Sequence, residues 1–536
     1  CGAQKKNAPI FSAAKRKNKE EKMKTRRSGF TVTVMIIATA LSKLLGMARQ
    51  IMLAKRLGDG VFAVSFSTAS KIPLSVFDIL LSAAIVACFV PFYSDKLTKN
   101  DDGARRFSSS FFTLTIIVSS VIAVLGSVFS KTILSVCAPS LSEEAFALGT
   151  KLLSVMFPMI IFTGAAYVLV GILQSHGNFI LPSLVSSISN IAVIIYLAVA
   201  RNIESEKAML TLAAIYVLSW AIQFFTLAVP IISKHLFPAL TIKLRGKGLA
   251  PALKAAPSVI AGAWLLPACS LLITFFASFV SDRAVAAFDY SVTLWLIASG
   301  VLTYGVCNFI LPSLSRTFSV GDDKEFSHQL VGAVFAALAL SLPVAIGLYF
   351  LSDNIICMIY MRGNFGAELA LICGKILGSL AFSVPFFCVF EVLSRGFFAR
   401  KHPFPVVVAS ISGITVFAAA GSVSVFILNA GEIAIAVSYG MAHFTSAMVL
   451  FIFAVIKIKG FFCKQLGISI GVVALSGGVC LAATALLHGF FEKNAVNSSI
   501  FQNFIVCAIV FSGGCVVYLI CIGILRKIEK TRSKEV

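Results

Sequence analysis

Residues 504–525, FIVCAIVFSGGCVVYLICIGIL, run for 22 positions without a charged side chain. An α-helix rises about 1.5 Å per residue, so this stretch is long enough to cross the roughly 30 Å of hydrocarbon in a bilayer. The stretch is apolar on nearly all sides, as is the stretch 338–351, whereas the strands of a membrane β-barrel alternate apolar and polar residues. The sequence therefore predicts membrane-spanning helices.

The same pattern recurs along nearly the whole chain. Of its 536 residues 58% are hydrophobic and 13% are charged, which excludes a water-soluble fold, in which about 25% of residues are charged. Apolar windows separated by polar breaks predict an all-α polytopic membrane protein with fourteen transmembrane helices. We expect them near 30–56, 61–94, 107–136, 146–175, 179–200, 208–233, 252–280, 284–316, 327–351, 367–399, 404–429, 433–458, 465–488 and 501–526.

The net charge of +22 indicates membrane topology and not nucleic-acid binding, because the Lys and Arg residues flank the apolar segments. If the basic arm 1–29 is cytoplasmic, every second loop should be cytoplasmic too, and those loops are the basic ones. They carry Lys96, Lys99, Arg105, Arg106, Lys234, Lys243, Arg245, Lys247, Arg400, Lys401, Lys457, Lys459 and Lys464. An even number of helices with both termini in the cytoplasm follows.

The first 29 residues are polar and basic. They fit either a disordered arm that sets the topology or a contact with anionic lipids. The chain begins with Cys1, so Met23 is a candidate start, and no cleavable signal peptide is expected.

An internal repeat divides the helices into two halves. Residues 90–94 (VPFYS) followed by Asp101-Asp102 recur as 311–315 (LPSLS) followed by Asp322-Asp323, at a constant offset of 221 residues. Repeated halves with a substrate site between them are typical of secondary transporters. We expect a basic cytoplasmic arm (1–29), an N-terminal lobe (30–233), a cytoplasmic linker (234–251), a parallel C-terminal lobe (252–458), two further helices (459–526) and a basic cytoplasmic tail (527–536).

The sequence contains no catalytic, metal-binding or nucleotide-binding motif among HExxH, GxSxG, paired CxxC and GxxxxGK[ST]. The 13 Cys and 6 His residues are dispersed. We therefore expect no enzyme, no metal and no cofactor, and transport that uses an existing gradient.

Charged residues inside the apolar segments are the candidate site residues, because a charge in the bilayer needs a polar cavity or a partner. Lys43 and Arg49 lie on the first helix, Lys71 on the second, Asp289 on the eighth and Lys375 on the tenth. Lys71 is also two turns from Asp78 on one helix face, so either an internal ion pair or a contact with substrate fits it. A cavity with such cations suits an anionic headgroup such as a pyrophosphate.

Four blocks of sequence stand out along these helices: 42–49 (SKLLGMAR), 71–73 (KIP), 89–91 (FVP), and 299–301 (SGV) leading to 311–316 (LPSLSR). Together they resemble the MurJ/MviN family, in helix order from about residue 30 to the end. The resemblance implies two six-helix lobes around a central cavity and two extra helices that form a lipid-facing groove, the fold of the multidrug/oligosaccharidyl-lipid/polysaccharide exporter superfamily.

The resemblance also implies a function. It implies a flippase in the bacterial inner membrane that moves lipid II, the undecaprenyl-pyrophosphate peptidoglycan precursor, from the inner to the outer leaflet. The implied partners are this anionic lipid-linked glycan and proteins of cell-wall synthesis or division. Lys43 and Arg49 match two first-helix cations that hold the pyrophosphate in the family.

Three positions depart from the family pattern. Phe77 and Thr293 stand where the family commonly has Arg, and Val64 where it often has an acidic residue. Lys71, Lys375 or Arg395 are candidates to compensate. Two alternatives therefore stay open: export of another polyprenyl-linked polysaccharide, and a membrane scaffold that does not transport.

Overall fold

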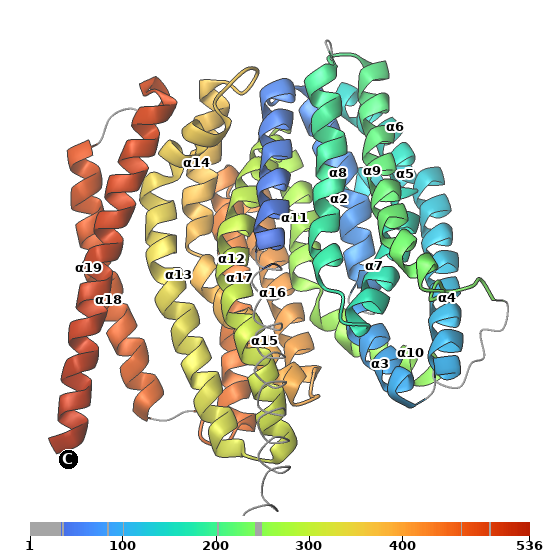
Figure 1. The fold of residues 1–536 in the computed structure, drawn as a ribbon. Coiled ribbons are helices and arrows are strands. Elements are labelled where there is room, and N and C mark those ends of the chain that lie inside the picture. Colours follow the sequence, from blue (N-terminus) through green and yellow to red (C-terminus); the bar gives the residue numbers. More distant parts are fainter. Residues whose placement is uncertain are drawn as a thin grey trace, which may run out of the picture.

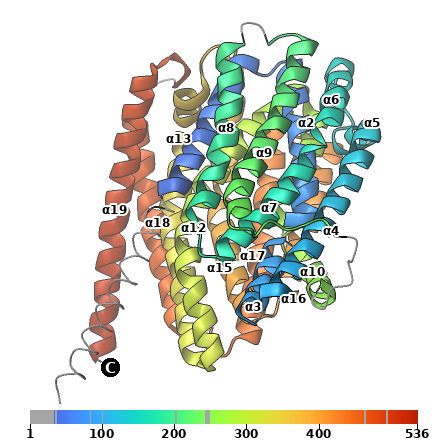
Figure 2. The same cartoon turned by 45° about the vertical axis from the view of Figure 1, so that its right-hand side comes forward.

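The computed structural model describes residue 34 and residues 37–82, 85–99, 101–200, 203–241, 249–461, 464–491 and 495–535. Within these ranges the chain forms helices and their connections, without a strand (Figures 1 and 2). The predicted all-α fold is confirmed. The arm 1–29, with Met23, and the linker residues 242–248 lie outside the described residues.

The first half of the chain begins with helix 37–57. It is followed by α2 (Val61–Phe77), the π-helical turns η1 (Asp78–Ser82) and η2 (Ile85–Phe89), α3 (Val90–Lys99), α4 (Asp101–Val128), α5 (Ser130–Cys137), α6 (Glu143–Met156), α7 (Met159–Ser175), α8 (Ile180–Val199) and α9 (Glu206–Ser233).

The second half begins with α10 (Leu249–Gly262). It continues with α11 (Leu265–Val280), α12 (Asp282–Val320), α13 (Asp323–Tyr360), α14 (Ala367–Ala381), α15 (Val384–Ala399), α16 (Phe404–Ser422), the π-helical turn η3 (Val423–Ile427), α17 (Glu432–Lys457), α18 (Lys464–Phe491), the 3-10 turn η4 (Ala495–Asn497) and α19 (Ile500–Glu535).

Each of the fourteen predicted spans corresponds to one helix or to several consecutive helical segments, the span 61–94 covering α2, η1, η2 and the start of α3. Among the described residues ten helices are long and apolar enough to cross a membrane, and two bent pairs, α6–α7 and α14–α15, raise the number to twelve. The other two predicted spans are helix 37–57, which carries four charged residues, and the pair α10–α11.

The bent pairs were predicted as single helices, and proline explains both breaks. Pro158 precedes α7, where the chain bends by 41°, and Pro385 lies in the first turn of α15, where it bends by 47°. Proline lacks the N–H that would continue the preceding helix, so the helix ends there.

The helices form two lobes and a pair at the edge. In the first lobe α7 packs against α4 and α9, and helix 37–57 joins it where the Ser42 hydroxyl donates to the Ser183 carbonyl of α8 at 2.8 Å. In the second lobe α12 packs against α13, α14 and α15, and α16 packs against α17. The predicted plan of two lobes and two further helices is therefore observed.

The lobes meet along α2. This helix contacts α11 and α12 of the second lobe, and α10 lies against its π-helical continuation. The Trp264 indole, between α10 and α11, donates to the Ile79 carbonyl of η1 at 3.0 Å. The interface between the lobes thus includes a contact at the irregular part of the second span.

The edge pair α18–α19 packs on α13 at the left of Figure 1. Two adjacent glycines of α18 differ at this contact. A Cβ atom on Gly477 would lie 2.2 Å from Leu342 Cδ2 of α13, whereas a Cβ atom on Gly478 would meet nothing within 4 Å. Gly477 therefore sets how closely α18 approaches the second lobe.

This difference gives a matched test of the packing. We expect Gly477→Leu to lower the stability of the purified protein by about 1–3 kcal/mol through overpacking against Leu342. Gly478→Leu changes the same residue type in the same turn and should leave stability nearly unchanged. Thermal unfolding in detergent, followed by intrinsic fluorescence, measures both; equal melting temperatures for the two variants would contradict the packing described here.

Candidate functional site

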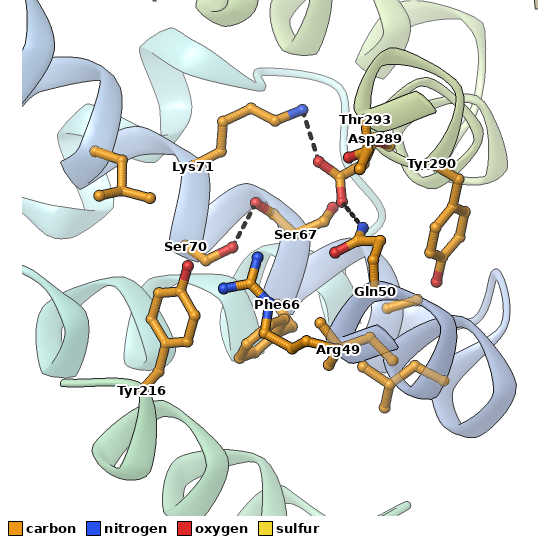
Figure 3. Close-up of a pocket in the computed structure, with 14 residues that line it drawn as sticks. Arg49, Gln50, Phe66, Ser67, Ser70, Lys71, Tyr216, Asp289, Tyr290 and Thr293 are labelled. Atoms are coloured by element: carbon orange, nitrogen blue, oxygen red, sulfur yellow. Dashed lines mark hydrogen bonds and ion pairs between the residues drawn. The ribbon is translucent and has the colours of Figure 1, made fainter. Parts of the chain in front are cut away.

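A cavity of about 160 Å³ lies between the two lobes (Figure 3). Helix 37–57, α2 and α9 of the first lobe and α12 of the second lobe form its walls. The lining residues are Arg49, Gln50, Leu53, Leu57, Ala63, Phe66, Ser67, Ser70, Lys71, Leu74, Tyr216, Asp289, Tyr290 and Thr293. Three of the five predicted site residues, Arg49, Lys71 and Asp289, therefore share one chamber.

An ion pair crosses this cavity from lobe to lobe. The Lys71 Nζ atom of α2 lies 3.1 Å from Asp289 Oδ1 of α12, and the two side chains are only 17% and 21% exposed. Gln50 Nε2 of helix 37–57 donates to the other carboxylate oxygen of Asp289 at 3.0 Å (Figure 3). The Asp289 carboxylate is thus held by two side chains of the opposite lobe.

Of the two interpretations open for Lys71, the intrahelical pair with Asp78 is not formed. Lys71 pairs with Asp289 instead, while Asp78 begins the π-helical turn η1.

Arg49 is the cation of this cavity that has no carboxylate partner among the described residues. Its guanidinium carbon lies 5.6 Å from the centre of the Tyr216 ring, and its Nε atom is buried without a hydrogen-bond partner. A cation over an aromatic face is weakly attracted to it, which orients the side chain without neutralising it. Arg49 therefore keeps its positive charge available to an anion.

The other two predicted site residues do not line this cavity. Lys43 lies on helix 37–57 and its Nζ atom is 3.2 Å from the point where a Cβ atom on Gly300 of α12 would stand. Lys375 is exposed on α14, where it interacts with Asp353 of α13. Lys43 thus sits at the interface between the lobes, and Lys375 on the surface of the second lobe.

Two residues that contact charged groups of the cavity were not predicted from the sequence. Gln50 of helix 37–57 donates to Asp289, which is 239 residues away in the sequence. Tyr216 of α9 contacts Arg49, a cation of another helix. The adjacency of Gln50 to Arg49 was the one available hint.

The lobes are also joined at one end of the bundle, the upper end in Figure 1, which we call the lock end. Asn364, in the α13–α14 connection, donates from its backbone N–H to the Lys55 carbonyl and from its side chain to the Arg56 carbonyl, both at 2.9 Å. Carbonyls at the C-terminal end of a helix lack partners within the helix. Asn364 of the second lobe therefore caps helix 37–57 of the first.

Two glycines allow this close approach. Gly58 has a φ of +61°, and a Cβ atom on it would lie 2.3 Å from the Asn364 carbonyl oxygen. Gly363 has a φ of +65°, and a Cβ atom on it would lie 2.4 Å from the Lys55 carbonyl oxygen. Glycine adopts positive φ without steric cost. The two backbones thus touch directly across the lobes.

Charged residues surround this contact. Arg283 of α12 pairs with Asp59 of the first lobe at 2.5 Å and with Glu368 of its own lobe at 2.7 Å. Asp282 accepts hydrogen bonds from the backbone and the hydroxyl of Ser142, at the start of α6. The lock end is therefore closed by polar contacts between the lobes.

Comparison with known proteins identifies the family. The sequence matches the family described as lipid II flippase MurJ over residues 53–506, which is most of the chain. The chain belongs to the MurJ family. The proposed resemblance is confirmed.

Individual relatives agree with this assignment. A probable lipid II flippase MurJ of Rhizobium tropici is 29% identical over 377 residues, which cover 68% of this chain and 69% of the relative. The lipid II flippase MurJ of Burkholderia cenocepacia is 23% identical over 429 residues, covering 77% and 81% of the two chains.

Solved structures share the fold. A lipid II flippase MurJ in an inward closed conformation superposes with a TM-score of 0.73 at 23% identity, covering 92% of this chain and 99% of that one. A multidrug MATE transporter of the MOP superfamily in an inward-facing conformation gives a TM-score of 0.65 at 13% identity over 80% of this chain. The MurJ-like transporter fold, and with it a multi-pass membrane protein, is thereby established.

The positions that depart from the MurJ pattern lie in different surroundings. Thr293 lines the cavity and donates its hydroxyl to the Asp289 carbonyl at 2.8 Å. Phe77 is 1% exposed and packs edge-on against Tyr167 at 5.1 Å, and Val64 is fully buried. Arg395, a candidate to compensate, pairs with Glu391 at 3.2 Å. The chamber of this MurJ-family member therefore carries Lys71 and Asp289 as its own charged pair.

The glycine contact predicts a change in the lock end. Gly363→Ala introduces a Cβ atom against the Lys55 carbonyl at positive φ, which costs about 1–2 kcal/mol from the backbone alone, so we expect the lock end to open more often. Spin labels carried on p-acetylphenylalanine at the exposed positions Glu143 and Ala367 report the distance between the lobes.

The matched control is Gly366→Ala in the same connection, where a Cβ atom would meet nothing within 4 Å. We expect longer distances for the 363 variant and an unchanged distribution for the 366 variant. A 363 variant with the distribution of the unaltered protein would show that the glycine contact does not hold the lock end closed.

Proposed function

We propose that this chain is a flippase that carries lipid II, or a closely related undecaprenyl-pyrophosphate glycan, from the inner to the outer leaflet by alternating access. The observation that carries the proposal is the unneutralised Arg49 in a cavity between the two lobes of a MurJ-family fold. Arginine offers paired donors that match phosphate oxygens, which is the chemistry that a pyrophosphate needs.

The charges of the loops orient the molecule in this proposal. The sequence ranges 95–106, 234–249, 399–403 and 457–464 are basic. The ends of α3, α15 and α17 that lead into three of these ranges lie at the end opposite the lock end (Figure 1). By the positive-inside rule this end is cytoplasmic, so the lock end faces the outside and both termini lie in the cytoplasm. The protein would then reside in the inner membrane of a bacterium, closed toward the outside.

The proposed division of labour follows the domain plan. In this proposal the lobes 30–233 and 252–458 form the cavity and rock about it. The arm 1–29, the linker 234–251 and the tail 527–536 stay in the cytoplasm. Helices 459–526 form a groove for the lipid chain of the substrate. In this proposal Arg49 and Lys71 contact the pyrophosphate in the cavity, Lys43 contacts it at the interface between the lobes, and Asp289 holds Lys71 in place before the substrate binds. Lys375, exposed on α14, would meet the headgroup from the lipid-facing side.

An apolar groove supports an amphiphilic substrate. It measures about 330 Å³ between α13 and α19 and is lined by Val344, Gly347, Leu348, Leu351, Ile355, Met358, Phe504, Cys507, Ala508 and Phe511. A polyprenyl chain is a partner of this chemistry, while the charged cavity suits the headgroup. The proposal includes no chemical conversion of the substrate, and therefore no catalytic residue and no cofactor.

Thr293 and Phe77 favour a second candidate, the export of a different polyprenyl-pyrophosphate polysaccharide. The family commonly has arginines at these positions, so the headgroup that this cavity binds can differ beyond the pyrophosphate. Competition between lipid II and undecaprenyl pyrophosphate that carries another glycan, in the same transport assay, separates the two candidates.

The proposal predicts the behaviour of Arg49 variants in proteoliposomes. We expect Arg49→Ala to lower the rate of lipid II translocation at least tenfold, because a hydrogen bond to a charged group contributes about 1.5–3 kcal/mol. Arg49→Lys keeps the charge but loses the paired donors, so it should retain an intermediate rate. Fluorescent lipid II that becomes accessible to a membrane-impermeant quencher measures the rate.

The control is Lys207→Ala, which removes an exposed cation of the first lobe outside the cavity and should leave the rate unchanged. Full activity of Arg49→Ala, or normal wall synthesis without accumulated precursor in cells depleted of the protein, would contradict the flippase and favour a scaffold.

A further inference from the structure

Two consecutive residues of α12, Asp289 and Tyr290, both line the cavity but contact the first lobe at different points. Asp289 points toward Lys71 and Gln50 (Figure 3). The Tyr290 hydroxyl donates to the carbonyl of Gly58, at the lock end, at 2.8 Å. Gly58 is the glycine whose backbone touches Asn364. One short segment of one helix therefore joins the charged site to the closure of the lobes.

The Tyr290 ring strengthens this connection. The side chain is 4% exposed, and its ring centre lies 5.4 Å from that of Tyr360 and 5.3 Å from that of Phe365. Tyr360 is the last residue of α13, and Phe365 follows Asn364 in the α13–α14 connection. A displacement of α12 at Tyr290 would thus disturb both the Gly58 hydrogen bond and the packing beneath Asn364.

The Lys71–Asp289 pair is accessible to an anion. Both side chains are partly exposed to the cavity, where Arg49 also lies without a carboxylate partner among the described residues. Lys71 has one positive charge, so an incoming phosphate and the Asp289 carboxylate compete for the same ammonium group. When a phosphate pairs with Lys71, the ion pair that links α12 to α2 is broken.

We propose that Asp289 is a counter-anion that the substrate's diphosphate displaces from Lys71, and that this displacement loosens the lock end through Tyr290. The inference rests on the proposed function, because it takes a diphosphate lipid as the ligand. It makes Asp289 and Tyr290 positioning residues that couple occupancy of the cavity to opening toward the outside.

Two roles of the Lys71–Asp289 pair, competition with the ligand and simple bracing of the lobes, predict different changes in ligand affinity when either residue is substituted. If Asp289 competes with the ligand, Asp289→Asn frees Lys71 and tightens binding of a diphosphate, while Lys71→Met weakens it. If the pair only braces the lobes, both variants remove the same brace and change binding in the same direction. The sign of the Asp289→Asn effect therefore separates the two roles.

The experiment uses the full-length protein in nanodiscs, with undecaprenyl pyrophosphate as the probe and undecaprenol as the uncharged comparison. Binding is measured by native mass spectrometry, and the distance between the lobes by spin labels at positions 143 and 367. We expect Asp289→Asn to bind the probe about fivefold tighter or more, within the usual range of coupling between sites, and to show longer distances without ligand.

Tyr290→Phe keeps the buried ring and removes the hydroxyl. It should bind the probe and show longer distances before the probe is added, because the Gly58 hydrogen bond is lost. Glu206→Gln is the matched control: it removes a carboxylate from the exposed Lys151–Glu206 pair within the first lobe, 2.6 Å between its charged atoms, and should change neither measurement.

The outcomes distinguish this inference from the function on which it rests. No binding of undecaprenyl pyrophosphate to the unaltered protein would overturn the proposed substrate. Binding that Asp289→Asn leaves equal or weakens would overturn the counter-anion role alone. Binding of the probe without any change in the distance between the lobes of the unaltered protein would overturn the coupling through Tyr290.

Discussion

The ion pair between Lys71 and Asp289 is the interaction on which the centre of the molecule depends. Both residues lie in membrane-spanning helices, where a single charge is costly and two opposite charges stabilise each other. Because the two partners belong to different lobes, neutralisation of Lys71 by Asp289 requires the lobes to be together at this level. The requirement ties the electrostatics of the site to the conformation of the whole protein.

The sequence predicted the spans well because a span is a local property. The run of 22 uncharged residues at 504–525 reads as a helix whatever surrounds it, and the structure places α19 there. The interruptions were not predicted from the same pattern. The π-helical turns η1 and η2 contain neither the proline nor the glycine that commonly marks a break in a helix. The bends at Pro158 and Pro385 became clear only once the flanking helices were placed.

The site could be predicted in part, for a related reason. Charge in an apolar segment marked Arg49, Lys71 and Asp289, which the fold brings into one cavity. The same criterion marked Lys375, which lies on the surface of α14, because charge alone does not tell which face of a helix turns inward. Pairing across 218 residues, such as Lys71 with Asp289, depends on how the lobes pack and has no local signal.

The two places where the lobes meet differ in what can replace their contacts. At the lock end the carbonyls of Lys55 and Arg56 and the exposed Glu368 border water, so each hydrogen bond that breaks can be exchanged for one to solvent at a net cost of about 0.5–1.5 kcal/mol. In the cavity an anion is the natural replacement for Asp289, because Lys71 keeps its charge when the pair separates. Water can therefore replace the contacts that break at the lock end, whereas separation of the Lys71–Asp289 pair in the cavity needs an anionic ligand. This difference can make opening of the lobes dependent on substrate.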